Sequence, residues 1–221
     1  MKDWNLYLMY FQVLTVGGCG FPGCGGLANA IVEGKAAVNA CPVGGEICAT
    51  KIGDIMGISY ESEEKQVAKV LCKGNCKSAK DKYKYEGIQD CRSASMLNSG
   101  PKDCRFGCLG FGTCKEYCKF DAISVIDGLA IIDEEKCVMR GKCIEVCPKS
   151  IIHIKPANKE VVVECSSEDF GKAVREKCSV GCIGCGLCKK ACLFGAIELE
   201  NKIAKICLLY TSPSPRDYAA S

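Results

Sequence analysis

Closely spaced cysteines are the residues of this chain most able to do chemistry, and they account for 21 of its 221 residues. The clearest group has C-x2-C-x2-C-x3-C spacing and consists of Cys182, Cys185, Cys188 and Cys192. Gaps of two residues let three successive thiolates bind one small inorganic core, while the fourth thiolate reaches a neighbouring cluster. Glycines between them let backbone amides approach the sulfides. The spacing therefore indicates 4Fe-4S clusters.

Two other uses of cysteine fit the sequence less well. Disulfide-rich secreted scaffolds are usually shorter than about 80 residues and have an even number of cysteines. This chain has an odd number and no recognisable signal peptide. Structural zinc also uses C-x2-C pairs, but it takes pairs that lie about a dozen or more residues apart. A zinc-binding interaction module stays as an alternative, which a visible absorption spectrum would distinguish.

The sequence contains an internal repeat of 74 residues. Its cysteines in the first copy are Cys91, Cys104, Cys108, Cys114 and Cys118, and in the second copy Cys165, Cys178, Cys182, Cys188 and Cys192. The residues after the last cysteine also agree, since 120–123 reads FDAI and 194–197 reads FGAI. We infer that one module was duplicated.

A predicted β-hairpin follows the cysteine run in each copy. In the first copy, apolar residues flank the turn signal Asp127-Gly128 within 124–131. A second cysteine run then follows, made of Cys137, Cys143 and Cys147. A strand pair between two cysteine runs is the layout of a two-cluster ferredoxin, in which the fourth cysteine of each run binds the other run's cluster.

The second copy starts the same hairpin at 196–201, but the cysteines of a second run are missing. The repeat positions hold Thr211, Asp217 and Ser221. We expect residues 207–221, including Cys207, to be a disordered or non-native tail. Cys192 is therefore left without the partner run that its position implies.

Two positions inside the modules depart from the ferredoxin pattern. Phe111 stands where the second copy has Cys185, so the first site needs another thiolate, and Cys104 is the natural substitute. Arg140 stands where the second run of the first copy requires cysteine. That site keeps Cys137, Cys143 and the cross-ligand Cys118. It could hold a 3Fe-4S cluster, a 4Fe-4S cluster with a non-cysteine ligand, or a normal cluster in a sequence altered by one base.

The N-terminal region follows a different cysteine rule. Cys19 and Cys24 form a C-x4-C pair, and sixteen residues separate Cys24 from Cys41. A helix predicted over 25–39 would bring Cys24 and Cys41 to one cluster. The fourth ligand would stand at Val16, and Cys48, within a predicted helix over 46–56, is interpreted as a buried small residue.

The remaining cysteines have open assignments. We expect a linker over 61–90 that starts with a polar stretch, and a short strand at 67–72 that 161–165 echoes. Cys72, Cys76 and Cys91 could form another cluster with a borrowed ligand. Alternatively, Cys91 and Cys165 belong to their own modules, and Cys72 and Cys76 are spare.

Charge and composition exclude several function classes. The formal net charge is +3, but four oxidised clusters of about −2 each would make it roughly −5. Basic residues are scattered singly, which gives nucleic-acid binding little support. No P-loop motif occurs, and the string Gly18–Gly23, which matches G-x-G-x-x-G, belongs to the N-terminal cysteine motif and follows no predicted strand, so we expect no direct NAD binding. The apolar stretch 6–16 is shorter than the roughly 20 residues that a spanning helix needs.

The motifs CGFPGCGGLANAIVEGKAAVNACPVGG, KYKYEGIQDC, GPKDCRFGCLGFGTC and CSVGCIGCGLC together resemble the B subunit of the Rnf complex, over residues 17–206. This complex is a membrane-bound, ion-pumping ferredoxin:NAD oxidoreductase. The resemblance implies a protein on the cytoplasmic face of a bacterial or archaeal membrane that takes electrons from reduced ferredoxin and passes them to membrane subunits. Family members begin with a membrane anchor and a C-x2-C-x4-C-x16-C motif, so residues 1–16 are interpreted as an anchor remnant or a non-native segment.

We therefore expect an α+β protein with about four 4Fe-4S clusters, electron transfer as its function and no catalytic side chains. The predicted parts are an N-terminal helical cluster domain at 17–60, a ferredoxin-like module at 91–159 and a truncated one at 160–206. The predicted cluster ligands are Cys19, Cys24, Cys41, Cys104, Cys108, Cys114, Cys118, Cys137, Cys143, Cys147, Cys182, Cys185, Cys188 and Cys192. Further candidates are Cys72, Cys76, Cys91, Cys165 and Cys178. A soluble polyferredoxin, or an electron-feeding component of another oxidoreductase, is the main alternative.

Overall fold

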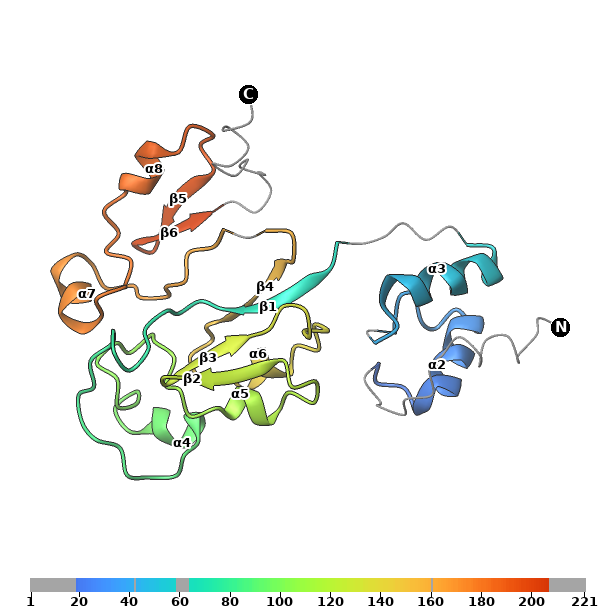
Figure 1. Ribbon diagram of the computed structural model, residues 1–221, viewed down its shortest axis with the longest axis horizontal. Coiled ribbons are helices and arrows are strands. Elements are labelled where there is room, and N and C mark those ends of the chain that lie inside the picture. Colours follow the sequence, from blue (N-terminus) through green and yellow to red (C-terminus); the bar gives the residue numbers. More distant parts are fainter. Residues whose placement is uncertain (1–18, 42, 59–63, 160, 207–221) are drawn as a thin grey trace. The chain divides into compact units, whose positions relative to one another are not determined.

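The computed structural model describes residues 19–41, 43–58, 64–159 and 161–206 (Figure 1). The chain divides into two compact units, Met1–Glu64 and Lys65–Ser221. The described residues contain short helices and two-stranded antiparallel sheets joined by long loops, which confirms the α+β class. The expectations for Val16, for the rest of 1–16 and for 207–221 lie outside the described residues. No helix in the described ranges is long and apolar enough to cross a membrane.

The first unit consists of two helices, α2 (Gly23–Val32) and α3 (Gly45–Met56). Its core is formed by Leu27 and Ile31 of α2 and by Ile52 of α3. The helix predicted over 25–39 is therefore wrong beyond Val32. Gly34, at φ 70°, turns the chain, and the amide of Lys35 donates to the carbonyl of Ala30, which closes the helix end. The helix predicted over 46–56 is confirmed.

The first copy of the repeat is built on the hairpin β2 (Ile123–Ile126) and β3 (Leu129–Ile132), which confirms the predicted hairpin. Asp127 and Gly128 both have positive φ, 49° and 70°, as the type I′ turn of a two-residue hairpin requires. Three short helices accompany it, α4 (Cys91–Met96), α5 (Thr113–Glu116) and α6 (Lys142–Val146).

A second sheet joins distant parts of the chain, since β1 (Gln66–Val70) pairs antiparallel with β4 (Ile152–Pro156). Val67 of β1 is completely buried and belongs to the core of the first copy. The predicted strand at 67–72 is thus confirmed at 66–70, whereas 161–165 contains no strand. Within the segment 61–90, β1 packs into the core of the first copy through Val67, Ala68 and Val70.

The second copy repeats the first in α8 (Leu187–Ala191), which corresponds to α5, and in the hairpin β5 (Ile197–Glu200) and β6 (Ile203–Ile206). Its other helix, α7 (Lys172–Lys177), has no helical counterpart at the repeat positions 98–103 of the first copy. The predicted second hairpin is confirmed. Its turn residues, Asn201 and Lys202, have φ of 49° and 67°, the same conformation as the turn of the first hairpin. The local sequence therefore forms the same hairpin twice.

Candidate iron-sulfur sites

Four cysteines of the first copy converge on one small pocket. Cys91 starts α4, Cys114 lies in α5, Cys147 follows the end of α6, and Cys108 lies on the loop before α5. Burial is the main cause that raises the pKa of Cys114 to about 12, followed by the neighbouring thiols, Cys108 first. Every cysteine in the described part of the chain is a free thiol. Four thiols around an apolar pocket fit the donor set of an iron–sulfur cluster.

The pocket differs from the predicted ligand set, because Cys91 lines it and Cys104 does not. Phe111, at the position of the missing cysteine, instead packs against Tyr85, with ring centroids 5.3 Å apart. The amide of Cys91 donates to Oγ1 of Thr113 at 2.8 Å, which fixes the start of α4 beside α5. Cys91 lies seventeen positions before Cys108, so the short spacing within a cysteine run does not predict that it shares a site with Cys108. The only signal in the sequence was the internal repeat.

The cysteine loop of each copy lies directly against its hairpin turn. A Cβ atom at Gly110, which has φ 80°, would lie 2.2 Å from the carbonyl oxygen of Gly128. A Cβ atom at Gly184, which has φ 67°, would lie 2.5 Å from the carbonyl oxygen of Lys202. Both glycines are thus required for the close approach as well as for the backbone conformation. They fix the cysteine loops relative to the hairpins.

A three-thiol group forms around Cys118, Cys137 and Cys143. Burial raises the pKa of Cys143, and the thiols of Cys137 and Cys118 raise it further. The sulfur of Cys137 accepts a hydrogen bond from the amide of Ala68 in β1 at 3.5 Å. Arg140 is exposed on the loop before α6. The described structure therefore brings together the three cysteines that the sequence predicted for this site.

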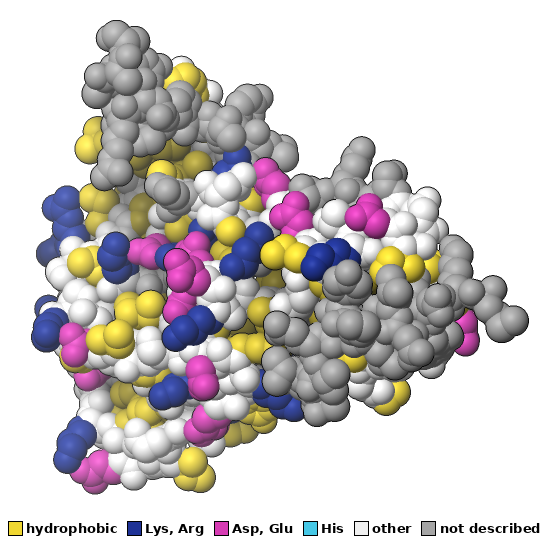
Figure 2. All heavy atoms as spheres, turned by 45° about the vertical axis from the view of Figure 1, so that its right-hand side comes forward, with side chains coloured by type: hydrophobic (Ala, Val, Ile, Leu, Met, Phe, Trp, Pro, Cys, Tyr) yellow, Lys and Arg dark blue, Asp and Glu magenta, His cyan; other side chains and the backbone are white. Residues whose placement is uncertain are grey.

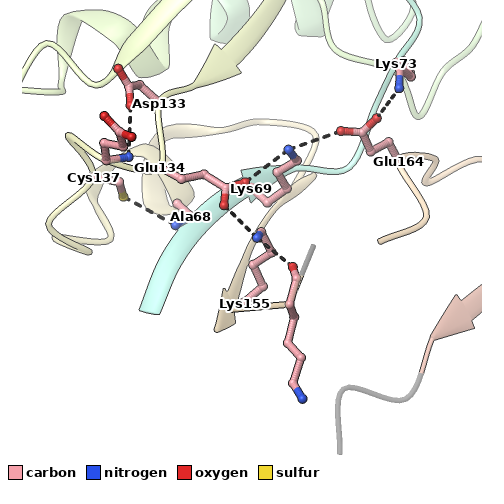
Figure 3. A network of polar contacts seen from close by, with 10 residues as sticks. Ala68, Lys69, Lys73, Asp133, Glu134, Cys137, Lys155 and Glu164 are labelled. Carbon is pink, nitrogen blue, oxygen red and sulfur yellow. Dashed lines mark hydrogen bonds and ion pairs between the residues drawn. The ribbon is translucent and has the colours of Figure 1, made fainter. Parts of the chain in front are cut away.

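A network of charged side chains supports the backbone beside Cys137 (Figure 3). Glu134 pairs with Lys155 at 2.8 Å and with Lys69 at 3.3 Å, and Lys69 also reaches Glu164 at 3.4 Å. Burial favours a raised pKa for Glu134, but hydrogen bonds from Lys155 and Lys69 outweigh it and lower the pKa. Because Lys155 is almost fully buried, the carboxylate of Glu134 neutralises a charge inside the protein. The network ties β1, β4 and the segment before Cys165 together.

The cysteine run of the second copy lies on the loop before α8, on α8 itself and at its end. Cys185 and Cys188 are exposed, and Cys182 and Cys192 are half-buried. This run is therefore more open to solvent than the buried cysteines of the first copy.

Cys165 does not take the place that Cys91 has in the first copy. The amide of Cys182 donates to the sulfur of Cys165 at 3.3 Å. In the first copy, the amide of the equivalent Cys108 donates to the sulfur of Cys72 at 3.4 Å. Cys165 therefore corresponds in space to Cys72, although the repeat aligns it with Cys91.

The first unit gathers its own cysteines. Burial raises the pKa of Cys24, and the thiols of Cys41 and Cys19 raise it further. The sulfur of Cys41 accepts a hydrogen bond from the amide of Gly44 at 3.3 Å. Cys48 is buried in α3, as predicted, and burial followed by Cys41 raises the pKa of its thiol. A Cβ atom at Gly44 would lie within 3.2 Å of the sulfurs of both Cys41 and Cys48, so the thiol of Cys48 faces this group, which the sequence did not indicate.

The structure does not bring Cys72, Cys76 and Cys91 together. Cys91 lines the pocket of the first copy, whereas Cys76 is exposed and its amide donates to the carbonyl of Asp127 at the hairpin turn. Cys72 lines a different pocket. Within the described ranges, no three cysteine, histidine, aspartate or glutamate side chains lie close enough to hold a single metal ion.

Comparison with known proteins places these sites in a family. Residues 17–43, which contain the first three cysteines, match a family described as "Putative Fe-S cluster". The chain is 42% identical over 191 residues to the B subunit of the ion-translocating oxidoreductase complex of Methanosarcina acetivorans, covering 86% of this chain and 72% of that protein. It belongs to the B-subunit family of these ion-translocating (Rnf) complexes.

Two further members of this family show the same relationship. The B subunit of the proton-translocating ferredoxin:NAD(+) oxidoreductase complex of Clostridium ljungdahlii is 44% identical, over 86% of this chain and 68% of its own length. The B subunit of the Na(+)-translocating ferredoxin:NAD(+) oxidoreductase complex of Acetobacterium woodii is 52% identical, over 86% of this chain and 57% of its own length. The chain thus spans a little over half of the Acetobacterium relative. As a member of this family, it is an iron–sulfur protein.

Proposed function

We propose that this chain is the iron–sulfur component that receives electrons from reduced ferredoxin and passes them into an ion-translocating ferredoxin:NAD oxidoreductase complex. The observation that carries the proposal is the convergence of Cys91, Cys108, Cys114 and Cys147 on one buried pocket in a member of the Rnf B-subunit family. A cluster bound there supplies reversible one-electron transfer. No side chain has to act as an acid, base or nucleophile.

The protein's own contribution is to hold the thiolates and set their surroundings. We assign one 4Fe-4S cluster to the pocket of Cys91 and Cys108, and one cluster to Cys118, Cys137 and Cys143. Cys182, Cys185 and Cys188 would hold a third, and Cys19, Cys24 and Cys41 a fourth. Amide donors to sulfur, such as Ala68 to Cys137, favour the thiolate and stabilise added negative charge. The burial of Cys108 and Cys114 would keep water away from a cluster held in the first-copy pocket.

The proposed architecture is a helical cluster domain at 17–60 followed by ferredoxin-like modules at 91–159 and 160–206. The repeated hairpins, glycine approaches and cysteine runs support it. We place the start of the linker after β1 instead of at residue 61, because β1 pairs with β4 of the first module.

The proposed partners are soluble ferredoxin and the other subunits of the complex, at the cytoplasmic face of the membrane. The names of the relatives support this, since two of them specify ferredoxin:NAD(+) oxidoreductase complexes. Figure 2 shows basic and acidic side chains interspersed on the face that it presents, a distribution unlike the basic stripe of a nucleic-acid-binding protein. NAD would be reduced elsewhere in the complex.

Anaerobic reconstitution with iron and sulfide tests the proposal. The purified chain should turn brown and its visible absorption should bleach on addition of reduced ferredoxin, because the clusters take up its electrons. A Cys114→Ser variant should lose about one cluster, and a matched Cys76→Ser variant should lose none. A colourless, zinc-loaded and stably folded product would overturn the proposal.

A further inference from the structure

A second pocket of the larger unit is lined by four cysteines to which the proposed function gives no cluster. They are Cys72, Cys104, Cys165 and Cys178. Cys72 follows β1, Cys104 lies on the loop that leads to Cys108, and Cys178 follows the end of α7. All four are half-buried free thiols. Four thiols from both copies of the repeat therefore surround one space.

The two copies contribute equivalent pairs of cysteines to this pocket. The sulfurs of Cys72 and Cys165 accept their hydrogen bonds from the amides of Cys108 and Cys182, which are equivalent in the repeat. Cys104 and Cys178 are equivalent in the repeat as well. One pair is Cys104 with Cys72, and the other is Cys178 with Cys165. In each pair the first cysteine belongs to a cysteine run, and the sulfur of the second accepts a hydrogen bond from an amide of that run.

The four thiols are close to one another. A Cβ atom at Gly74 would lie 3.4 Å from the sulfur of Cys178 and 3.7 Å from that of Cys72, so the absence of a side chain there opens the space between them. Cys104 and Cys165 line the same pocket as these two cysteines.

A strap over 78–82 holds the two cysteine loops in place. The amide of Lys80 donates to the carbonyl of Lys177 at 2.9 Å, and the amide of Ser179 donates to the carbonyl of Ser78 at 2.9 Å, on either side of Cys178. The amide of Asp103 donates to the carbonyl of Lys80 at 2.8 Å, next to Cys104. The backbone of this strap thus fixes the spacing between Cys104 and Cys178.

The pocket also contains a buried cation. The side chain of Lys102 lines it, and this residue is only 4% exposed. Its ammonium group donates to the carbonyls of Gly74 and Gly128 at 2.8 and 2.9 Å, and within the described part of the chain no carboxylate pairs with it. A buried ammonium without a counter-ion is costly, so the pocket favours a negatively charged occupant. A cluster with four thiolates, of about −2 charge when oxidised, has the required sign.

We propose that Cys72, Cys104, Cys165 and Cys178 bind a further 4Fe-4S cluster, which bridges the two copies of the repeat. The inference rests on the proposed electron-transfer function. The amides of Cys108 and Cys182 join its ligands to the assigned ligands of the two neighbouring clusters. One electron leaves a reduced neighbour and enters the oxidised bridging core, and then leaves it for the other neighbour, with no bond formed or broken. The cluster is thus a relay between the two modules.

Iron and acid-labile sulfide analysis of the anaerobically reconstituted full chain tests the bridge. A Cys72→Ser/Cys165→Ser variant should lose about four iron and four sulfide ions relative to the parent and keep the other clusters. The matched variant Cys76→Ser, at an exposed cysteine that lines neither pocket, should lose none. Equal iron in the parent and the Cys72→Ser/Cys165→Ser variant would overturn the bridge alone, whereas a parent without any cluster would overturn the proposed function.

A second variant decides the case in which the double variant loses all of its iron. Lys102→Met removes the buried charge and keeps the length of the side chain. Because the cation stabilises the more negative, reduced cluster, the midpoint potential of one cluster should fall in this variant while the others stay unchanged. An unchanged set of potentials, at the same iron content as the parent, would overturn the bridge.

Discussion

In the first copy of the repeat, α5 is covered by protein, with Thr113 3% and Cys114 8% exposed. In the second copy, the equivalent helix α8 is uncovered, since Leu187 is 68% exposed and Cys188 is exposed. The two hairpins have the same register and the same turn conformation, so the difference does not come from the hairpins. It comes from α6, which follows the first hairpin and packs against α5, and from β4, whose Ile152 lines the same pocket as Cys108 and Cys114. A cysteine run and the hairpin after it are enough to position the thiols. The segment that carries the second cysteine run is needed to bury them.

The largest expected effect of this difference is on how fast each site loses iron. The second-copy site should release iron to a chelator roughly tenfold faster than the first-copy site. Its exposed cysteines can be reached by the chelator in the folded module, whereas the buried cysteines of the first copy become accessible only when the module unfolds locally. Release from the parent should therefore show a fast and a slow phase. Cys188→Ser should abolish the fast phase, and its repeat equivalent Cys114→Ser should abolish a slow one. Equal rates for the two sites would contradict the comparison.

Supplying the missing run should make the second copy resemble the first. Replacement of residues 207–221 by a copy of 133–150, with cysteine at the position of Arg140, should add about one cluster and slow the fast phase of iron release. The control carries serine in place of every cysteine of the added run. If the control slows iron release as much as the cysteine version, then coverage and not ligation determines lability.

Arg140 allows the same comparison within the first copy. Arg140→Cys should complete the ligand set around Cys118, Cys137 and Cys143 and add about one iron per chain. The oxidised parent should give a 3Fe-type electron paramagnetic resonance signal, which should be absent from this variant and retained in Arg140→Ser. Identical spectra and iron content in all three proteins would mean that the cross-ligation by Cys118 is wrong.

The smallest expected effect concerns the hairpin turns. Lys202 has positive φ where the first hairpin has Gly128, and a side chain in this conformation costs about 1 kcal/mol. Lys202→Gly should therefore stabilise the second hairpin by about 1 kcal/mol, and the reciprocal Gly128→Lys should destabilise the first by at least as much. Thermal unfolding of the reconstituted protein would measure both. A lower midpoint for Lys202→Gly would show that the turn is not the weak point of this hairpin.

Local sequence determined the features that depend on near neighbours in the chain. Asp127-Gly128 between apolar residues predicted the first hairpin, and the repeat predicted the second, because turn geometry and strand register are set within about ten residues. Glu46 at the start and Gly57 at the end bound α3 close to its predicted limits. The spacing of the cysteine runs identified the cofactor class and, with the N-terminal motif, the family.

Tertiary structure alone decided which thiols share a pocket. Cys91 joins Cys108, and Cys104 joins Cys72, Cys165 and Cys178, through pairing of β1 with β4 and through the strap over 78–82. These contacts link residues that are tens of positions apart, and no spacing rule relates their distance in sequence to their distance in space. The cysteines of a run bind one cluster because the few residues between them keep their thiolates close together. An isolated cysteine comes close to its partners only when the core forms.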